Sequence, residues 1–143
     1  MVNIIGHPSI SDFFLNLVNS QDKNKIELAA RLYTLLERLN IDPTGKNTPW
    51  INVCEIKEFK NKAFIFHVFF RAKIIPYLGS SSDIYFRVIF ICDQDLKCNV
   101  YFFLGHRDYS SNTMSLIRKR YWEFNTVLRQ NYLSGEIPLW RCS

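Results

Sequence analysis

The sequence lacks a hydrophobic run long enough to cross a membrane. Its longest nearly uncharged apolar stretch is residues 63–70, whereas a membrane-spanning helix needs about 20 residues. The N-terminus also lacks the basic segment and the long apolar segment that form a signal peptide. We therefore expect a cytoplasmic protein with no membrane partner.

The sequence motifs of several enzyme classes are also missing. There is no phosphate-binding glycine-rich loop, no Gly-x-Ser-x-Gly and no His-Glu-x-x-His. The four cysteines form no Cys-x-x-Cys pair, and no histidine stands at zinc-ligand spacing from them. We expect reduced thiols, with Cys54 and Cys92 buried as small hydrophobic groups in apolar runs. The sequence predicts neither a metal site nor a small-molecule cofactor.

The material for one hydrophobic core is plentiful. Of the 143 residues, 48% are hydrophobic and 15% aromatic, and only five are glycine and five proline. This composition excludes disordered, collagen-like and low-complexity chains. A chain of this length favours a single domain, which we assign to residues 1–143.

Two helical patterns begin the chain and one follows the strands. Residues 9–12 resemble a capping box with Ser9 as the cap, and from Asn24 leucines recur at helical spacing, so we expect a helical hairpin over 9–40. Glu27 and Arg31 are spaced to form an ion pair within the second helix. Apolar residues from Met114 to Leu128 predict a C-terminal helix over 112–131. Its expected solvent side carries Arg118, Lys119, Arg120 and Arg129.

Between these helices the hydrophobic period changes to two. Residues 64–73, 84–92 and 98–104 predict strands, and the polar turn at 93–97 predicts an antiparallel hairpin between the last two. In the first of these strands one face is apolar and the other becomes cationic towards Arg71 and Lys73. We expect an α+β domain in which an antiparallel sheet of three to four strands spans 50–107. The helices should then pack on one face of that sheet.

The positive charge is concentrated in two segments. The net charge is +5, residues 1–47 are balanced, and residues 48–73 and 106–143 each have an excess of three positive charges. Two basic segments brought together by the fold favour a polyanionic partner. The alternative is an ordinary solvated surface.

Basic and proton-transferring residues cluster at the predicted strand ends. Arg87 lies within an apolar strand and needs solvent, an anion, or a carboxylate such as Asp83 or Asp95. His106, Arg107 and Tyr109 follow the last strand. For His106 the alternative role is a local turn contact, and for Tyr109 it is packing.

Residues 83–93, which contain Arg87, and residues 100–109, which contain Gly105, His106 and Arg107, resemble the RelE/ParE superfamily of bacterial toxins. The similarity is to its HigB-like or phage-derived branch. A weaker similarity covers 57–62. The sequence departs from the pattern at 110–113, where the family often has a tyrosine, and its connection from Arg71 to Asp83 is longer than usual.

The resemblance implies a RelE-like fold and the toxin of a type II toxin–antitoxin system. Such a protein would act as a ribosome-associated mRNA endoribonuclease (an mRNA interferase) that inhibits translation, and a cognate antitoxin would neutralise it. Metal-free cleavage through the RNA 2′-hydroxyl needs a base, an acid and cations. We assign catalysis to Arg87, Arg107, His106 and Tyr109. Phosphate or RNA binding is assigned to Arg71, Lys73, Lys57, Lys60, Lys62 and His67.

Tyr85 or Phe69 could stack a base beside these cations. The alternative function is a non-catalytic module of the same fold. Such a module would be a ParE-type gyrase inhibitor or a domain that recruits a protein or a nucleic acid.

Overall fold

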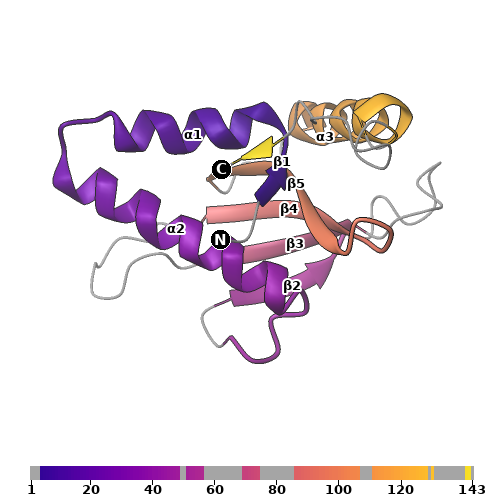
Figure 1. Ribbon diagram of the computed structural model, residues 1–143, viewed down its shortest axis with the longest axis horizontal. Coiled ribbons are helices and arrows are strands. Elements are labelled where there is room, and N and C mark those ends of the chain that lie inside the picture. The colour runs from indigo at the N-terminus through magenta and orange to yellow at the C-terminus, as the bar shows by residue number, and fades with distance from the viewer. Residues whose placement is uncertain are drawn as a thin grey trace.

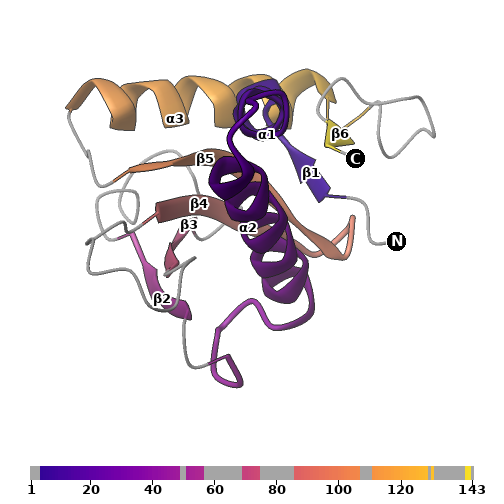
Figure 2. The same ribbon diagram turned by 90° about the vertical axis from the view of Figure 1, so that its left-hand side faces the viewer.

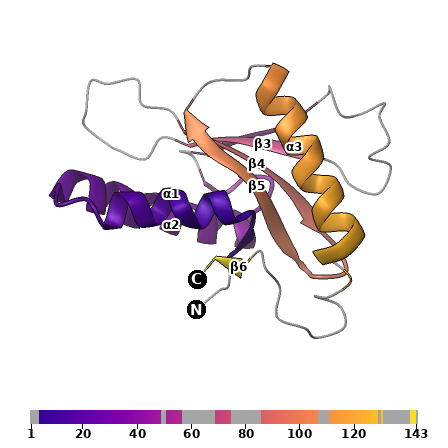
Figure 3. The same ribbon diagram turned by 90° about the horizontal axis from the view of Figure 1, so that it is seen from above.

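A six-stranded sheet separates the N-terminal helices from the C-terminal helix in the computed structural model of the protein (Figure 3). The structure describes residues 4–48, 51–56, 69–74, 86–106, 111–128, 130 and 141–142. The helical elements are α1 (Pro8–Val18), α2 (Lys23–Ile41), α3 (Ser111–Glu123) and the π-helical turn η2 (Phe124–Leu128). The strands are β1 (Ile4–Gly6), β2 (Ile51–Glu55), β3 (Phe69–Ile74), β4 (Phe86–Asp93), β5 (Cys98–His106) and β6 (Arg141–Cys142).

The predicted helical hairpin is present, but its first helix has a different cap. His7, not Ser9, is the N-cap of α1: its Nδ1 accepts a hydrogen bond from the Ser9 amide at 3.1 Å, and Pro8 occupies the first turn. Proline suits this position because its missing N–H has no helical partner there anyway. Burial, and secondarily the charge of Arg120, lower the pKa of His7 to about 4. The neutral ring is therefore available as an acceptor.

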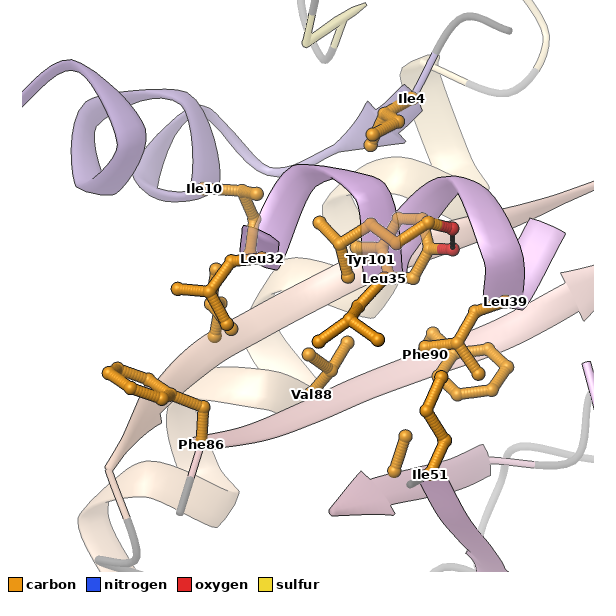
Figure 4. Close-up of a cluster of buried hydrophobic side chains, with 13 residues drawn as sticks. Ile4, Ile10, Leu32, Leu35, Leu39, Ile51, Phe86, Val88, Phe90 and Tyr101 are labelled. Atoms are coloured by element: carbon orange, nitrogen blue, oxygen red, sulfur yellow. Dashed lines mark hydrogen bonds between the residues drawn. The ribbon is translucent and has the colours of Figure 1, made fainter. Parts of the chain in front are cut away.

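Helix α2 is fixed at its start by a side chain and along its length by packing. Asp22 caps it by accepting a hydrogen bond from the Asn24 amide at 2.9 Å. The predicted ion pair is confirmed, with 2.9 Å between Arg31 Nη2 and Glu27 Oε1. Leucines of α2 pack onto the sheet with Phe86, Val88 and Phe90 of β4 (Figure 4).

The sheet contains the predicted antiparallel strands and two more. Its order is β2-β3-β4-β5-β1-β6, and β2 to β5 form an antiparallel meander (Figure 1). The expected number of strands, three to four, was too small, because β1 pairs in parallel with β5 and β6 pairs with β1. The sheet is therefore mixed. A strand of three buried residues is too short to show a period of two.

The helices cover both faces of the sheet, so the expectation of one covered face was wrong. Helices α1 and α2 pack on the face of Phe86, Val88 and Phe90, whereas α3 packs on the face of Ile89 and Ile91 (Figure 2). The physical reason is β4, which is apolar on both sides and needs cover on both. Among the described residues, no helix is long and apolar enough to cross a membrane.

A β-bulge joins α3 to the sheet. The β4–β5 register shifts between Ile89 and Phe90, so that Ile89 pairs with Phe103 and Phe90 with Tyr101. Phe102 is the extra residue, and its carbonyl accepts a hydrogen bond from Arg120 Nη1 at 2.6 Å. Arg120 was expected in solvent, but its guanidinium is half-buried and donates a hydrogen bond to the carbonyl at the bulge. Helix α3 passes into η2 at Phe124, residue 130 is again helical, and the predicted end of this helix at 131 lies outside the described residues.

Buried polar groups connect the end of α2 to β5. Tyr101 donates its hydroxyl to the Leu36 carbonyl at 2.9 Å, and Asn99 Nδ2 donates to the Leu39 carbonyl at 2.8 Å. The Cys92 thiol donates to Asn99 Oδ1 at 3.2 Å, and burial raises its pKa. The expectation of a buried Cys54 was wrong, since this thiol on β2 is exposed. Cys54, Cys92 and Cys98 are free thiols.

Candidate nucleic-acid interface

Three residues of the predicted site share one face of the sheet. Lys73 of β3 lies directly across from Arg87 of β4, and Arg71 lies two positions before Lys73 on the same strand. Positions two apart on a strand belong to the same face of a sheet, as do directly paired positions. We name Arg71, Lys73 and Arg87 the basic row. Asn52 of β2 and Gly105 of β5 continue the row on its two sides.

The basic row lies on the face that α3 partly covers. Arg87 alternates with the buried Phe86 and Val88, which face α1 and α2, so it points to the other side. Further along that side, Ile89 is fully buried and belongs to the cluster that includes Ile117 of α3. Arg71 and Arg87, in contrast, keep part of their surface exposed. The face is thus divided between an apolar part under α3 and a partly exposed cationic part.

One proposed partner of Arg87 is excluded by distance. Asp95 lies in the turn beyond the other end of β4. Arg87 lies six positions before the strand end at Asp93, which corresponds to about 20 Å of extended chain. An arginine side chain does not reach that far. The second proposed partner, Asp83, is outside the described residues.

The remaining predicted residues fall into two groups. His106 ends β5 and pairs with Phe86, so the register places it on the face of α1 and α2, not on the face of Arg87. Arg107 and Tyr109 lie outside the described residues. The same holds for Lys57, Lys60, Lys62 and His67, and for Tyr85 among the candidate stacking residues. Phe69 begins β3 opposite Ile91, which places its backbone position on the Arg87 face.

Phe103 and Gly105 are functional candidates that sequence reasoning missed. Both lie on the Arg87 face, and Gly105 is directly opposite Arg87. The Phe103 ring lies across Gly105: its Cζ is 3.0 Å from the point where a Cβ on Gly105 would stand. The bulge at Phe102 determines this arrangement, and a bulge leaves no period in the sequence from which it could be predicted.

No group of three or more histidine, cysteine or acidic side chains in the described part of the chain could hold a metal ion. The arrangement is instead suited to charge–charge contact, with guanidinium donors that match phosphate oxygens.

The chain matches no protein-family model, no curated protein and no solved structure.

Proposed function

We propose that the protein is the toxin of a toxin–antitoxin pair and cleaves messenger RNA on the ribosome without a metal. The single observation that supports this most is the basic row: three cationic residues of β3 and β4 occupy one face, and Arg71 and Arg87 remain partly exposed there. Cations at this density bind phosphates and stabilise charge that develops on them. The arrangement of helical hairpin, antiparallel meander and C-terminal helix also fits the resemblance to RelE-like toxins.

In this proposal Arg87 has the central electrostatic role. Attack of a 2′-hydroxyl on the adjacent phosphate places additional negative charge on the non-bridging oxygens. A guanidinium fixed on a central strand can neutralise that charge without reorganising. Arg71 and Lys73 hold the flanking phosphates. Proton transfer is assigned to Tyr109, with Arg107 as a further cation, and the cognate antitoxin would block this surface.

A second candidate function is binding without catalysis. His106 is the one candidate proton-transfer residue whose backbone the structure describes, and its register position is on the face opposite to Arg87. Among the candidate proton-transfer residues that the structure describes, none lies on the face of the basic row, and a cationic row without such a partner binds a polyanion but does not cleave it. This observation favours a module that inhibits gyrase or recruits a protein or a nucleic acid.

Induced expression in bacteria followed by mapping of RNA 5′ ends separates the two functions. We expect growth arrest and new mRNA ends within codons, and we expect both to disappear in Arg87→Ala. Arg31→Ala is the matched control, because Arg31 is paired with Glu27 on α2, away from the basic row. Growth arrest without new RNA ends would favour the non-catalytic module. If the folded wild-type protein causes neither growth arrest nor new RNA ends, the toxin proposal is overturned.

A further inference from the structure

A glycine stands opposite Arg87 and an aromatic ring fills the space above it. Gly105 pairs with Arg87, and Phe103 pairs with Ile89, the residue two positions further along β4. The ring of Phe103 bends over Gly105, with Cζ and Cε1 at 3.0 and 3.4 Å from the position of the absent Cβ. A side chain at position 105 would push the ring away. The glycine therefore allows an aromatic ring to lie next to the strand position of Arg87.

Phe103 differs from Phe102 and Phe124, two other phenylalanines on this side of the sheet. Phe102 and Phe124 are fully buried and make an edge-to-face contact with ring centroids 5.9 Å apart. Phe103 contacts the rim of the same cluster but remains partly exposed. The bulge produces this difference, because it turns two consecutive residues, Phe102 and Phe103, to one face. One ring enters the core, and the other stays at the boundary with the basic row.

We infer that Phe103 is a stacking surface for a nucleobase, and that the site takes single-stranded RNA. This inference rests on the proposed function and names the form of RNA that the basic row accepts. An unpaired base exposes a π-face that can lie on Phe103, while its phosphates contact Arg87 and its neighbours. Bases within a duplex are already stacked on one another and offer no such face. The combination of a cationic row and one aromatic ring thus selects single strands.

The test compares three RNAs in binding to the full chain: a fluorescein-labelled single strand, an abasic strand of equal length and charge, and a duplex. We expect the single strand to bind most tightly. Phe103→Leu should weaken that binding by about tenfold or more, since stacking on one aromatic is worth about 1–3 kcal/mol per base. It should leave binding of the abasic strand unchanged.

Further variants separate loss of stacking from loss of folding. Phe103→Tyr keeps a ring and should restore single-strand affinity, whereas Gly105→Ala should reduce it without removing a ring or a charge. Trp122→Leu is the control: this aromatic on α3 is 42% exposed and is not among the residues of the basic row. Thermal melting of each variant reports whether it is folded.

The outcomes distinguish this inference from the proposed function. Equal affinity of the wild-type protein for the normal and abasic strands would overturn the stacking role while leaving the basic row in place. Unchanged single-strand affinity in Phe103→Leu would overturn it as well, and so would tighter binding of the duplex. If no RNA of any kind binds, or Arg87→Ala binds as tightly as wild type, the proposed function fails first.

Discussion

The guanidinium of Arg120 donates a hydrogen bond of 2.6 Å to the carbonyl of Phe102, at the residue that bulges out of β5. The bond connects α3 to the sheet at the bulge itself. Burial lowers the pKa of Arg120, but an arginine remains charged at neutral pH. Because the bulge also directs Phe103 towards Gly105, this contact from α3 supports the geometry of the candidate site.

Replacing Arg120 by alanine should therefore destabilise the fold. A hydrogen bond from a charged donor contributes about 1.5–3 kcal/mol, and the variant removes this bond from a partly buried carbonyl. We expect a loss of about 2 kcal/mol in the free energy of unfolding, measured by urea denaturation. Arg31→Ala, which removes an exposed ion pair on α2, should change it by less than about 0.5 kcal/mol. Equal effects of the two variants would show that the Arg120 contact adds no stability.

His7 should make the protein sensitive to mild acid. Burial and the nearby Arg120 charge lower its pKa from 6.5 to about 4, outweighing the opposite effect of Asp12. Between these two pH values the unfolded chain binds a proton on His7 that the folded chain does not bind. The contribution of His7 to the free energy of unfolding should thus be fully present above pH 6.5. It should be lost as the pH drops towards about 4.

His7→Asn tests the assignment, because asparagine caps a helix and does not titrate. Urea unfolding at pH 7 and pH 5 should show a smaller difference for this variant than for the wild type. A pH dependence identical to that of the wild-type protein would mean that other groups cause the acid sensitivity.

Gly6 and Gly105 offer a matched pair of glycine-to-alanine changes in strands. A Cβ on Gly6 would stand 2.8 Å from the backbone carbonyl oxygen of Tyr101, which cannot move without disturbing the β1–β5 ladder. At Gly105 the nearest atom is the end of a phenylalanine ring, which can rotate away. We expect Gly6→Ala to reduce the free energy of unfolding by about 1–3 kcal/mol and Gly105→Ala by clearly less. Thermal melting of both variants checks the order, and the reverse order would contradict this account of β1.

The elements with a strong local pattern were predicted from the sequence. The hairpin expected over 9–40 is observed from Pro8 to Ile41, and the antiparallel turn between β4 and β5 lies where the polar residues predicted it. The alternation in the first strand also placed Arg71 and Lys73 together, and the register adds Arg87. These features depend on neighbours within a few residues, which a single sequence displays directly.

The missed features depend on contacts between distant segments. Strand β1 exists because Ile5 and Gly6 pair with Val100 and Tyr101, far away in the chain. The half-buried position of Arg120 follows from a bulge almost twenty residues earlier, so its local sequence suggested solvent. His106 was grouped with Arg87 by proximity to the strand end, but a shift of one position along a strand reverses the face.

The last prediction concerns Arg87 itself, whose replacement should separate binding from folding. Alanine keeps a Cβ on β4 and removes a charge that is partly desolvated in the folded protein. We expect little change in thermal stability, together with weaker binding of single-stranded RNA. Rate constants for cleavage should fall by about 10²-fold or more, the usual effect of losing one preorganised charge at a reacting phosphate.

A salt titration tests directly whether Arg87 contacts a phosphate. Each phosphate neutralised on a single strand contributes about 0.7 to the slope of log affinity against log salt concentration. Arg87→Ala should therefore lower the magnitude of the slope by about 0.7, whereas Arg31→Ala should leave the slope unchanged. An unaltered slope with full affinity would remove Arg87 from the interface. Loss of folding in Arg87→Ala would instead assign the guanidinium a structural role within the sheet, because a charge needed only for RNA is dispensable when no RNA is bound.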